Sequence, residues 1–146
     1  MGTRSLLAVE APVQTFTLPR PPSKNALKTP ISRGKYTNMI DTKAYRLWKS
    51  EARGILIRLK PILVIGPVQA TIIVQRLRKG SDCHNYVQAT LDILEPFEPK
   101  KKGDGEPFTG VIENDSLVAP ILVDWERDEA GEPVKGDQIE ITIEPR

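Results

Sequence analysis

The spacing of apolar residues changes from one segment of this chain to the next, and that change constrains the fold more than any other feature. In 138–146, QIEITIEPR, isoleucines alternate with Glu and Thr, which predicts a strand with one buried and one wet face. In 41–61, apolar residues recur at steps of three and four, which predicts an amphipathic helix. A chain that holds both spacings is expected to pack helices against a sheet.

The remaining elements follow from the same patterns. Strands are predicted within 15–18, 68–78 and 116–126, and a second helix from Ser81 or Asp82 to Pro96. Prolines at 19, 21 and 22 begin a loop that is expected to run to about Asn38. The first helix, capped by Asp41 or Thr42, is expected to bury Ala44, Leu47, Trp48, Ala52, Ile55, Leu56 and Leu59. This order favours a mixed α/β fold with two helices packed on one small mixed sheet.

The length of the chain fits one domain. We expect a single domain over 1–146, with a flexible tail at 1–14 and a long mobile connection at 96–110. One cysteine excludes an internal disulfide, and the apolar run near the amino terminus is too short for a signal peptide. These two features favour a cytoplasmic protein. Since no apolar run approaches the roughly 18 residues of a membrane helix, we also expect no membrane association.

Charge is distributed very unevenly along the chain. Residues 1–60 hold twelve Lys and Arg against three acids, whereas residues 103–146 hold three against twelve. A basic first part suits a polyanion such as a nucleic acid, although basic and acidic segments that face each other in the fold would give the same count. If a nucleic acid is the partner, we expect its contacts to come from Arg20, Lys24, Lys28, Arg33, Lys35 and Lys79.

The only cysteine and the only histidine lie together in DCHN at 82–85, where a strand is expected to end and a helix to begin. They fall short of the three or four N/S ligands of a zinc site, and neighbouring residues rarely form a nucleophile–base pair. A magnesium site is easier to argue, because Mg²⁺ prefers carboxylate oxygens and keeps several waters. It therefore needs only a few acids from separate segments, here Asp82 with Glu113 and Asp115. An ordinary helix cap at Asp82 and an ordinary turn at Asp115 are the alternatives.

Three short blocks, in this order, resemble the RusA family of Holliday junction resolvases, which are small phage and prophage endonucleases. The blocks are LPRPPSKN at 18–25, SDCHNYVQATLDIL at 81–94 and GVIENDS at 110–116, and the similarity spans roughly 16–143. The resemblance implies a RusA-like homodimer that cuts four-way DNA junctions in recombination and repair. Two-fold symmetry suits that task, because it supplies two active sites for two symmetric cuts.

The resemblance also implies which residues would form the site. The catalytic and metal-binding residues would be Asp82, His84 and Asp115, with Mg²⁺ or Mn²⁺ as the ion. His84 falls where most members have a second aspartate. The supporting residues would be Asn85, Gln88 and Asp92.

This chain departs from the family pattern at two positions. Gln88 stands where the family usually has a lysine, and Asn114 replaces one of two aspartates. Either change can cost orders of magnitude in rate, because metal and charge stabilisation dominate phosphoryl chemistry. A protein that binds branched DNA without cutting it is therefore an alternative. A small dimeric interaction module with no DNA role and a Cys–His hydrolase are two further alternatives.

Overall fold

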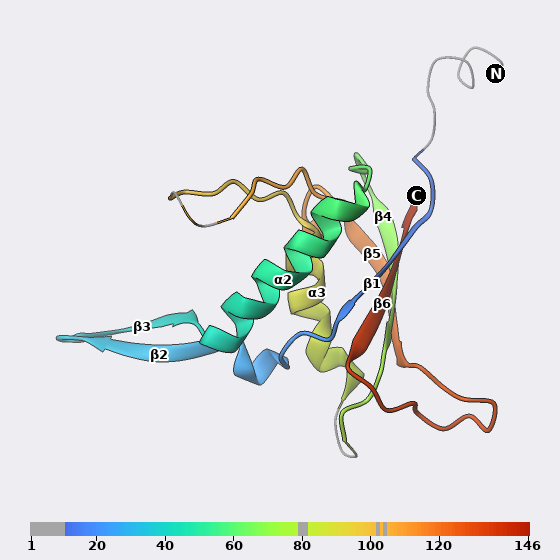
Figure 1. Ribbon diagram of the computed structural model, residues 1–146, viewed down its shortest axis with the longest axis horizontal. Coiled ribbons are helices and arrows are strands. Elements are labelled where there is room, and N and C mark those ends of the chain that lie inside the picture. The colour runs from blue at the N-terminus through green and yellow to red at the C-terminus, as the bar shows by residue number, and fades with distance from the viewer. Residues whose placement is uncertain (1–10, 79–81, 102, 104) are drawn as a thin grey trace, which may run out of the picture.

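The computed structural model describes residues 11–78, 82–101, 103 and 105–146 (Figure 1). Lys79, Ser81 and most of the expected tail at 1–14 lie outside the described residues, although Gln14 already belongs to the first strand. The elements, in chain order, are β1 (Gln14–Pro19), η1 (Lys24–Ala26), β2 (Lys28–Arg33), β3 (Tyr36–Asp41), α2 (Lys43–Leu59), β4 (Val68–Val74), η2 (Cys83–Tyr86), α3 (Val87–Leu94), η3 (Asp115–Leu117), β5 (Val118–Trp125) and β6 (Gln138–Pro145).

Four strands form one mixed sheet in the order β1-β6-β4-β5. β6 runs antiparallel to β1 and β4, whereas β4 and β5 are parallel. The alternation predicted for the last strand is confirmed, since Ile139, Ile141 and Ile143 are at most 1% exposed. Helices α2 and α3 lie on the face of the sheet that these isoleucines form (Figure 1). The expected class, a mixed α/β fold with two helices on a mixed sheet, is therefore confirmed. Among the described residues, no helix has the length and apolar character needed to cross a bilayer.

Both ends of α2 follow the local sequence. The Thr42 hydroxyl oxygen caps the helix by accepting a hydrogen bond from the Tyr45 amide at 3.2 Å. The helix stops at Leu59 because Lys60 adopts a left-handed conformation, with φ of 52°, and Pro61 cannot continue the helical hydrogen bonding. The predicted limits of this helix are confirmed.

The predicted apolar face of α2 is only partly right. The buried residues are Tyr45, Trp48, Ala52 and Leu56, whereas Leu47 and Leu59 are 60% and 54% exposed. The indole of Trp48 donates a hydrogen bond to the Pro19 carbonyl at 2.8 Å and its ring stacks with that of Tyr45. These contacts fix the rotation of the helix, so its buried stripe is centred on the aromatic pair.

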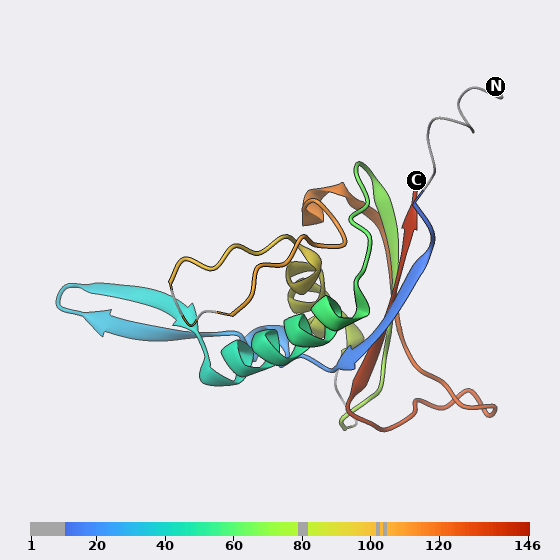
Figure 2. The same cartoon turned by 45° about the horizontal axis from the view of Figure 1, so that its top comes forward.

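The prediction of a loop that runs to about Asn38 is wrong, because most of this segment is a β-hairpin. β2 and β3 form an antiparallel two-stranded sheet in which Arg33 pairs with Tyr36 across the turn. Gly34, with φ of 63°, takes the first turn position, where a two-residue hairpin favours glycine. Pro30 pairs with Met39 within this hairpin, because a strand with a free edge tolerates proline. The hairpin projects away from the sheet and helices (Figures 1 and 2).

The second helical segment and the connection after it agree with the sequence in part. Tyr86, Ala89, Thr90, Ile93 and Leu94 are buried, and their three- and four-residue spacing is that of one helix face. The connection at 96–110 is joined at its base, where the backbones of two phenylalanines, Phe97 and Phe108, exchange hydrogen bonds of 2.8 and 2.9 Å. The same connection returns the chain to α3, since the Val111 amide donates to the Leu94 carbonyl at 2.7 Å.

Candidate functional site

The proline-rich block after β1 lies against the start of the second helical segment. Trp48 holds the Pro19 carbonyl, and the guanidinium of Arg20 donates to the carbonyls of Gln75, at 2.8 Å, and of Gly136. These bonds direct the chain so that η1 comes into contact with η2. Two blocks that lie more than fifty residues apart in the sequence, at 18–25 and 81–94, are therefore neighbours in space.

Asp82 and His84 form an exposed acid–imidazole pair at the start of η2. One carboxylate oxygen of Asp82 accepts a hydrogen bond from the His84 amide at 3.0 Å and lies 3.0 Å from the His84 Nδ1. Mainly that backbone hydrogen bond, followed by the imidazole contact, keeps the pKa of Asp82 below its usual value. The two side chains are 65% and 69% exposed, so an ionised oxygen and a ring nitrogen face solvent together.

These two side chains are suited to hold a divalent cation. Among the described residues, ligand atoms of Asp82, Cys83 and His84 lie within 4.8 Å of one another. Cys83 is a poor candidate, since it is 8% exposed and burial raises the pKa of its thiol, which keeps it protonated. The same protonation speaks against a Cys–His hydrolase. Asp82 and His84 remain as two accessible ligands, a set that leaves room for the waters that Mg²⁺ retains.

A cleft of about 940 Å³ reaches Asn85, the residue after His84, although Asp82 and His84 do not line it. It lies between the proline-rich block, α2 and η2, and its lining includes Ser23, Asn25, Trp48, Asn85 and Tyr86. The side chain of Asn85 belongs to the same short helix as His84. Hydroxyl, amide and aromatic groups in one open cleft are the kinds of side chain that contact a sugar–phosphate backbone.

A smaller cavity, of about 300 Å³, also borders η1 and is rich in charge. The expected supporting residues Gln88 and Asp92 line it, and so do four cations: Lys24, Lys28, Lys49 and Arg53. Gln88 is thus close to cations of η1, β2 and α2, of which Lys28 and Lys49 bind Asp41. Lys24 is also close enough to Asp82 for its charge to lower the pKa of that carboxyl.

Tyr45 and Asp92 form a polar pair at the bottom of this cavity that the sequence analysis missed. The Tyr45 hydroxyl donates to Asp92 Oδ2 at 3.3 Å. Burial is the main reason that the pKa of Asp92 is raised, and the nearby charge of Asp115 adds to the shift. The helical spacing of Tyr45 and Trp48, three residues apart, was the available signal that Tyr45 faces inward.

Asp115 lies at the opposite end of α3 from Asp82. Its backbone amide donates to Glu95 Oε2 at 2.9 Å, and Glu95 is the residue that ends α3. The segments η2 and α3 together span about 20 Å, from the usual rise of 3-10 and α-helices. Within one chain, Asp115 is therefore not brought to the Asp82–His84 pair. A rigid helical segment keeps the two acids apart.

The other polar residues of the third block have local structural contacts. Asn114 Oδ1 accepts from the Ser116 amide at 2.9 Å and so caps η3. Glu113 Oε1 accepts from the Gly66 amide at 2.6 Å, in the turn before β4. The carboxylate of Glu113, which the sequence suggested as a metal ligand, therefore has a structural contact with that turn. Asp115 is the exposed acid of the block that stays a candidate ligand.

The expected DNA contacts differ in how available they are. Lys24, Lys28 and Lys35 are exposed, on η1 and the β2–β3 hairpin. Arg20 is half-buried and its guanidinium binds two backbone carbonyls, so we assign it a structural role. Lys79 and the side chain of Arg33 lie outside the part of the chain that the structure describes.

No protein-family model matches the sequence, and no curated protein matches it significantly. The class of protein that these observations define is a mixed α/β protein with an exposed Asp–His pair and a polar cleft.

Proposed function

We propose that the protein is a RusA-like, metal-dependent, structure-selective DNA endonuclease that resolves four-way junctions. The observation that carries the proposal is the Asp82–His84 pair, in which an ionised carboxylate oxygen lies 3.0 Å from an imidazole nitrogen at an exposed helix start. The proposal is also supported by the contact between η1 and η2, which brings two of the three resembling blocks together.

Each part of the site has a distinct task in this proposal. Asp82 and His84 would hold a Mg²⁺ or Mn²⁺ ion, and an imidazole ligand favours Mn²⁺. When bound, such an ion supplies an activated water and neutralises charge that develops on the phosphate. Lys24, whose charge lowers the pKa of Asp82, would bind a DNA phosphate next to the metal ion. Asn85 would contact the DNA strand that lies in the cleft.

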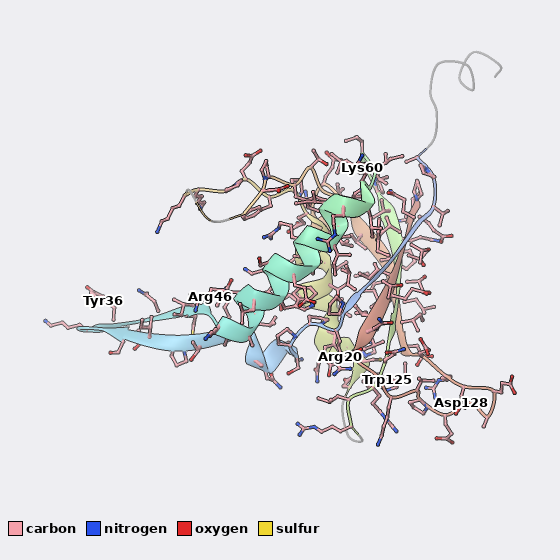
Figure 3. The ribbon with its side chains drawn as sticks, in the orientation of Figure 1. Arg20, Tyr36, Arg46, Lys60, Trp125 and Asp128 are labelled. Atoms are coloured by element: carbon pink, nitrogen blue, oxygen red, sulfur yellow. The ribbon has the colours of Figure 1, made fainter. Side chains whose placement is uncertain are left out.

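The arrangement of charge supports a nucleic acid as the partner. The basic hairpin, with Tyr36 at its tip, lies at one end of the molecule, and the acidic turn that contains Asp128 lies at the other (Figure 3). DNA held against η1 and the hairpin would therefore be far from that turn. This separation argues against the simpler explanation of the charge pattern, in which the basic and acidic segments face each other within one fold.

A homodimer would bring Asp115 to the proposed site. β5 is an edge strand, and its Ile121 and Leu122 are 38% and 57% exposed. η3, which contains Asp115, leads directly into β5, and Trp125 at the other end of β5 contacts Tyr86 of η2 at a ring-centroid distance of 6.4 Å. Antiparallel pairing of two β5 edges about a two-fold axis would set the start of one strand beside the end of the other. Asp115 of each copy would then approach the Asp82–His84 pair of the other copy.

Incubation of the protein with a synthetic four-way junction tests the proposed function. We expect paired cuts with Mg²⁺ or Mn²⁺, no cuts with EDTA and much weaker cutting of linear duplex. Binding should fall steeply between low and moderate salt, because phosphate contacts release counterions. Junction binding without cutting in either metal would favour the impaired alternative that Gln88 and Asn114 suggest. Salt-insensitive behaviour without junction binding would favour an interaction module with no DNA role.

A further inference from the structure

The β2–β3 hairpin is an arm whose side chains are not needed by the core. Its two strands have six residues each, which gives an arm of about 20 Å. Among the described residues β2 and β3 pair only with each other. Figures 1 and 2 show the hairpin extending away from both helices and from the four-stranded sheet. An isolated two-stranded hairpin is marginally stable in water, so a long one that carries no core residues at its tip suggests a role in binding.

The composition of the arm indicates a polyanionic partner. Residues 11–40 contain five Lys and Arg and no acid. Asp41, the first acid after this stretch, lies at the foot of the arm, where Lys28 and Lys49 bind it. The turn at the opposite end of the arm is polar and basic, with the sequence SRGK at 32–35. Such a ribbon suits the major groove of DNA, which is about 12 Å wide and admits two strands.

One aromatic ring lies exposed at the tip of the arm. Tyr36 is 74% exposed and follows the turn directly, and Figure 3 places it at the extreme end of the molecule. A ring in this position contributes nothing to the core, but its flat face is available to a base that has left its stack. At the branch point of a four-way junction, bases are easier to unstack than in a continuous duplex.

We propose that the β2–β3 hairpin enters the branch point of the junction and that Tyr36 stacks on an unstacked base there. This inference rests on the proposed function, and it adds a recognition element remote from the Asp82–His84 pair. Lys35, which is exposed in the turn of the arm, binds a phosphate beside the branch, and the ring of Tyr36 distinguishes a branch from a continuous duplex. A second copy of the chain, bound through its acidic end, is the competing occupant of the arm.

Fluorescent junctions with 2-aminopurine at a branch nucleotide test this inference with the full-length protein. We expect Tyr36→Ala to weaken junction binding about tenfold, to leave duplex binding nearly unchanged and to remove the fluorescence change of the probe. Tyr36→Phe keeps the ring and should behave like the wild type. Met39→Ala is the matched control, because Met39 is 60% exposed on the same hairpin but on its opposite face.

Two results would overturn the inference alone: wild-type junction binding and probe signal in Tyr36→Ala, or loss of junction binding in Met39→Ala to the same extent. A third result would be that Tyr36→Ala changes the protein from dimer to monomer in sedimentation, while the monomer binds the junction as the wild type does. The arm would then bind a second copy of the chain and not the junction. A wild-type protein that binds no junction at all would overturn the proposed function and this inference with it.

Discussion

Asp82→Asn is expected to slow metal-dependent junction cutting by at least about 100-fold, while junction affinity stays within about twofold. The substitution removes an ionised oxygen that would bind the cation and leaves the size of the side chain unchanged. Because Asp82 is 65% exposed and an asparagine oxygen can still cap η2, the fold should be unaffected. Cleavage of a labelled junction under single-turnover conditions, beside a gel-shift titration in EDTA, measures both quantities.

The control for this variant is Glu129→Gln, which makes the same change of charge on an exposed residue in the acidic turn between β5 and β6. It should cut at the wild-type rate. Equal loss in both variants would mean that net charge, and not a ligand at residue 82, sets the rate. Cutting by Asp82→Asn at the wild-type rate would contradict the proposed role of this carboxylate.

A mixture of Asp82→Asn and Asp115→Asn protomers is expected to regain activity that each variant lacks alone. If each site takes Asp82 from one copy and Asp115 from the other, a mixed dimer has one site with both substitutions and one site with neither. Random assembly from equal amounts makes half of the dimers mixed, so nicking should return to about one quarter of the wild-type rate. Nicking by the equal mixture gives this measurement, and the mixed dimer purified after co-expression with two different tags should nick at about half of the wild-type rate.

The mixed dimer separates the two ways of building the site. If Asp82 and Asp115 of the same chain served one site, every site in the mixture would carry a substitution and no activity would return. Recovery would also have to show as single nicks, because only one site per mixed dimer is intact. A monomer in sedimentation experiments at the protein concentration of the assay would contradict the composite site directly.

The parts of the fold that could be predicted are those set by local sequence. Alternation of isoleucines along β6 and the Thr42 cap and Pro61 stop of α2 depend on neighbouring residues, so their positions were correct. The rotation of α2 was not predictable in this way, because it depends on the bond from Trp48 to the distant Pro19 carbonyl. The hairpin was missed because the loop begun by Pro19, Pro21 and Pro22 was extended to Asn38, whereas pairing between β2 and β3 starts at Lys28, after those prolines.

The candidate site also has parts that local sequence predicts and parts that depend on the tertiary fold. Asp82 and His84 are two residues apart, so a local pattern was enough to place them together. The position of Asp115 depends on the length of α3 and on the path of 96–110, which returns to the far end of that helix. The cations near Gln88 come from η1, β2 and α2, and their convergence is a property of the tertiary fold.

The most direct test of the account is whether a divalent cation binds at the Asp82–His84 pair. His84 is the only histidine, so the imidazole region of a ¹H–¹³C NMR spectrum reports on this one side chain. We predict that Mn²⁺, added below one equivalent, broadens the His84 ring signals in the wild-type protein and leaves them sharp in Asp82→Asn. Ring signals that stay sharp in the wild type under excess Mn²⁺, or broaden equally in both proteins, would contradict the proposed metal site.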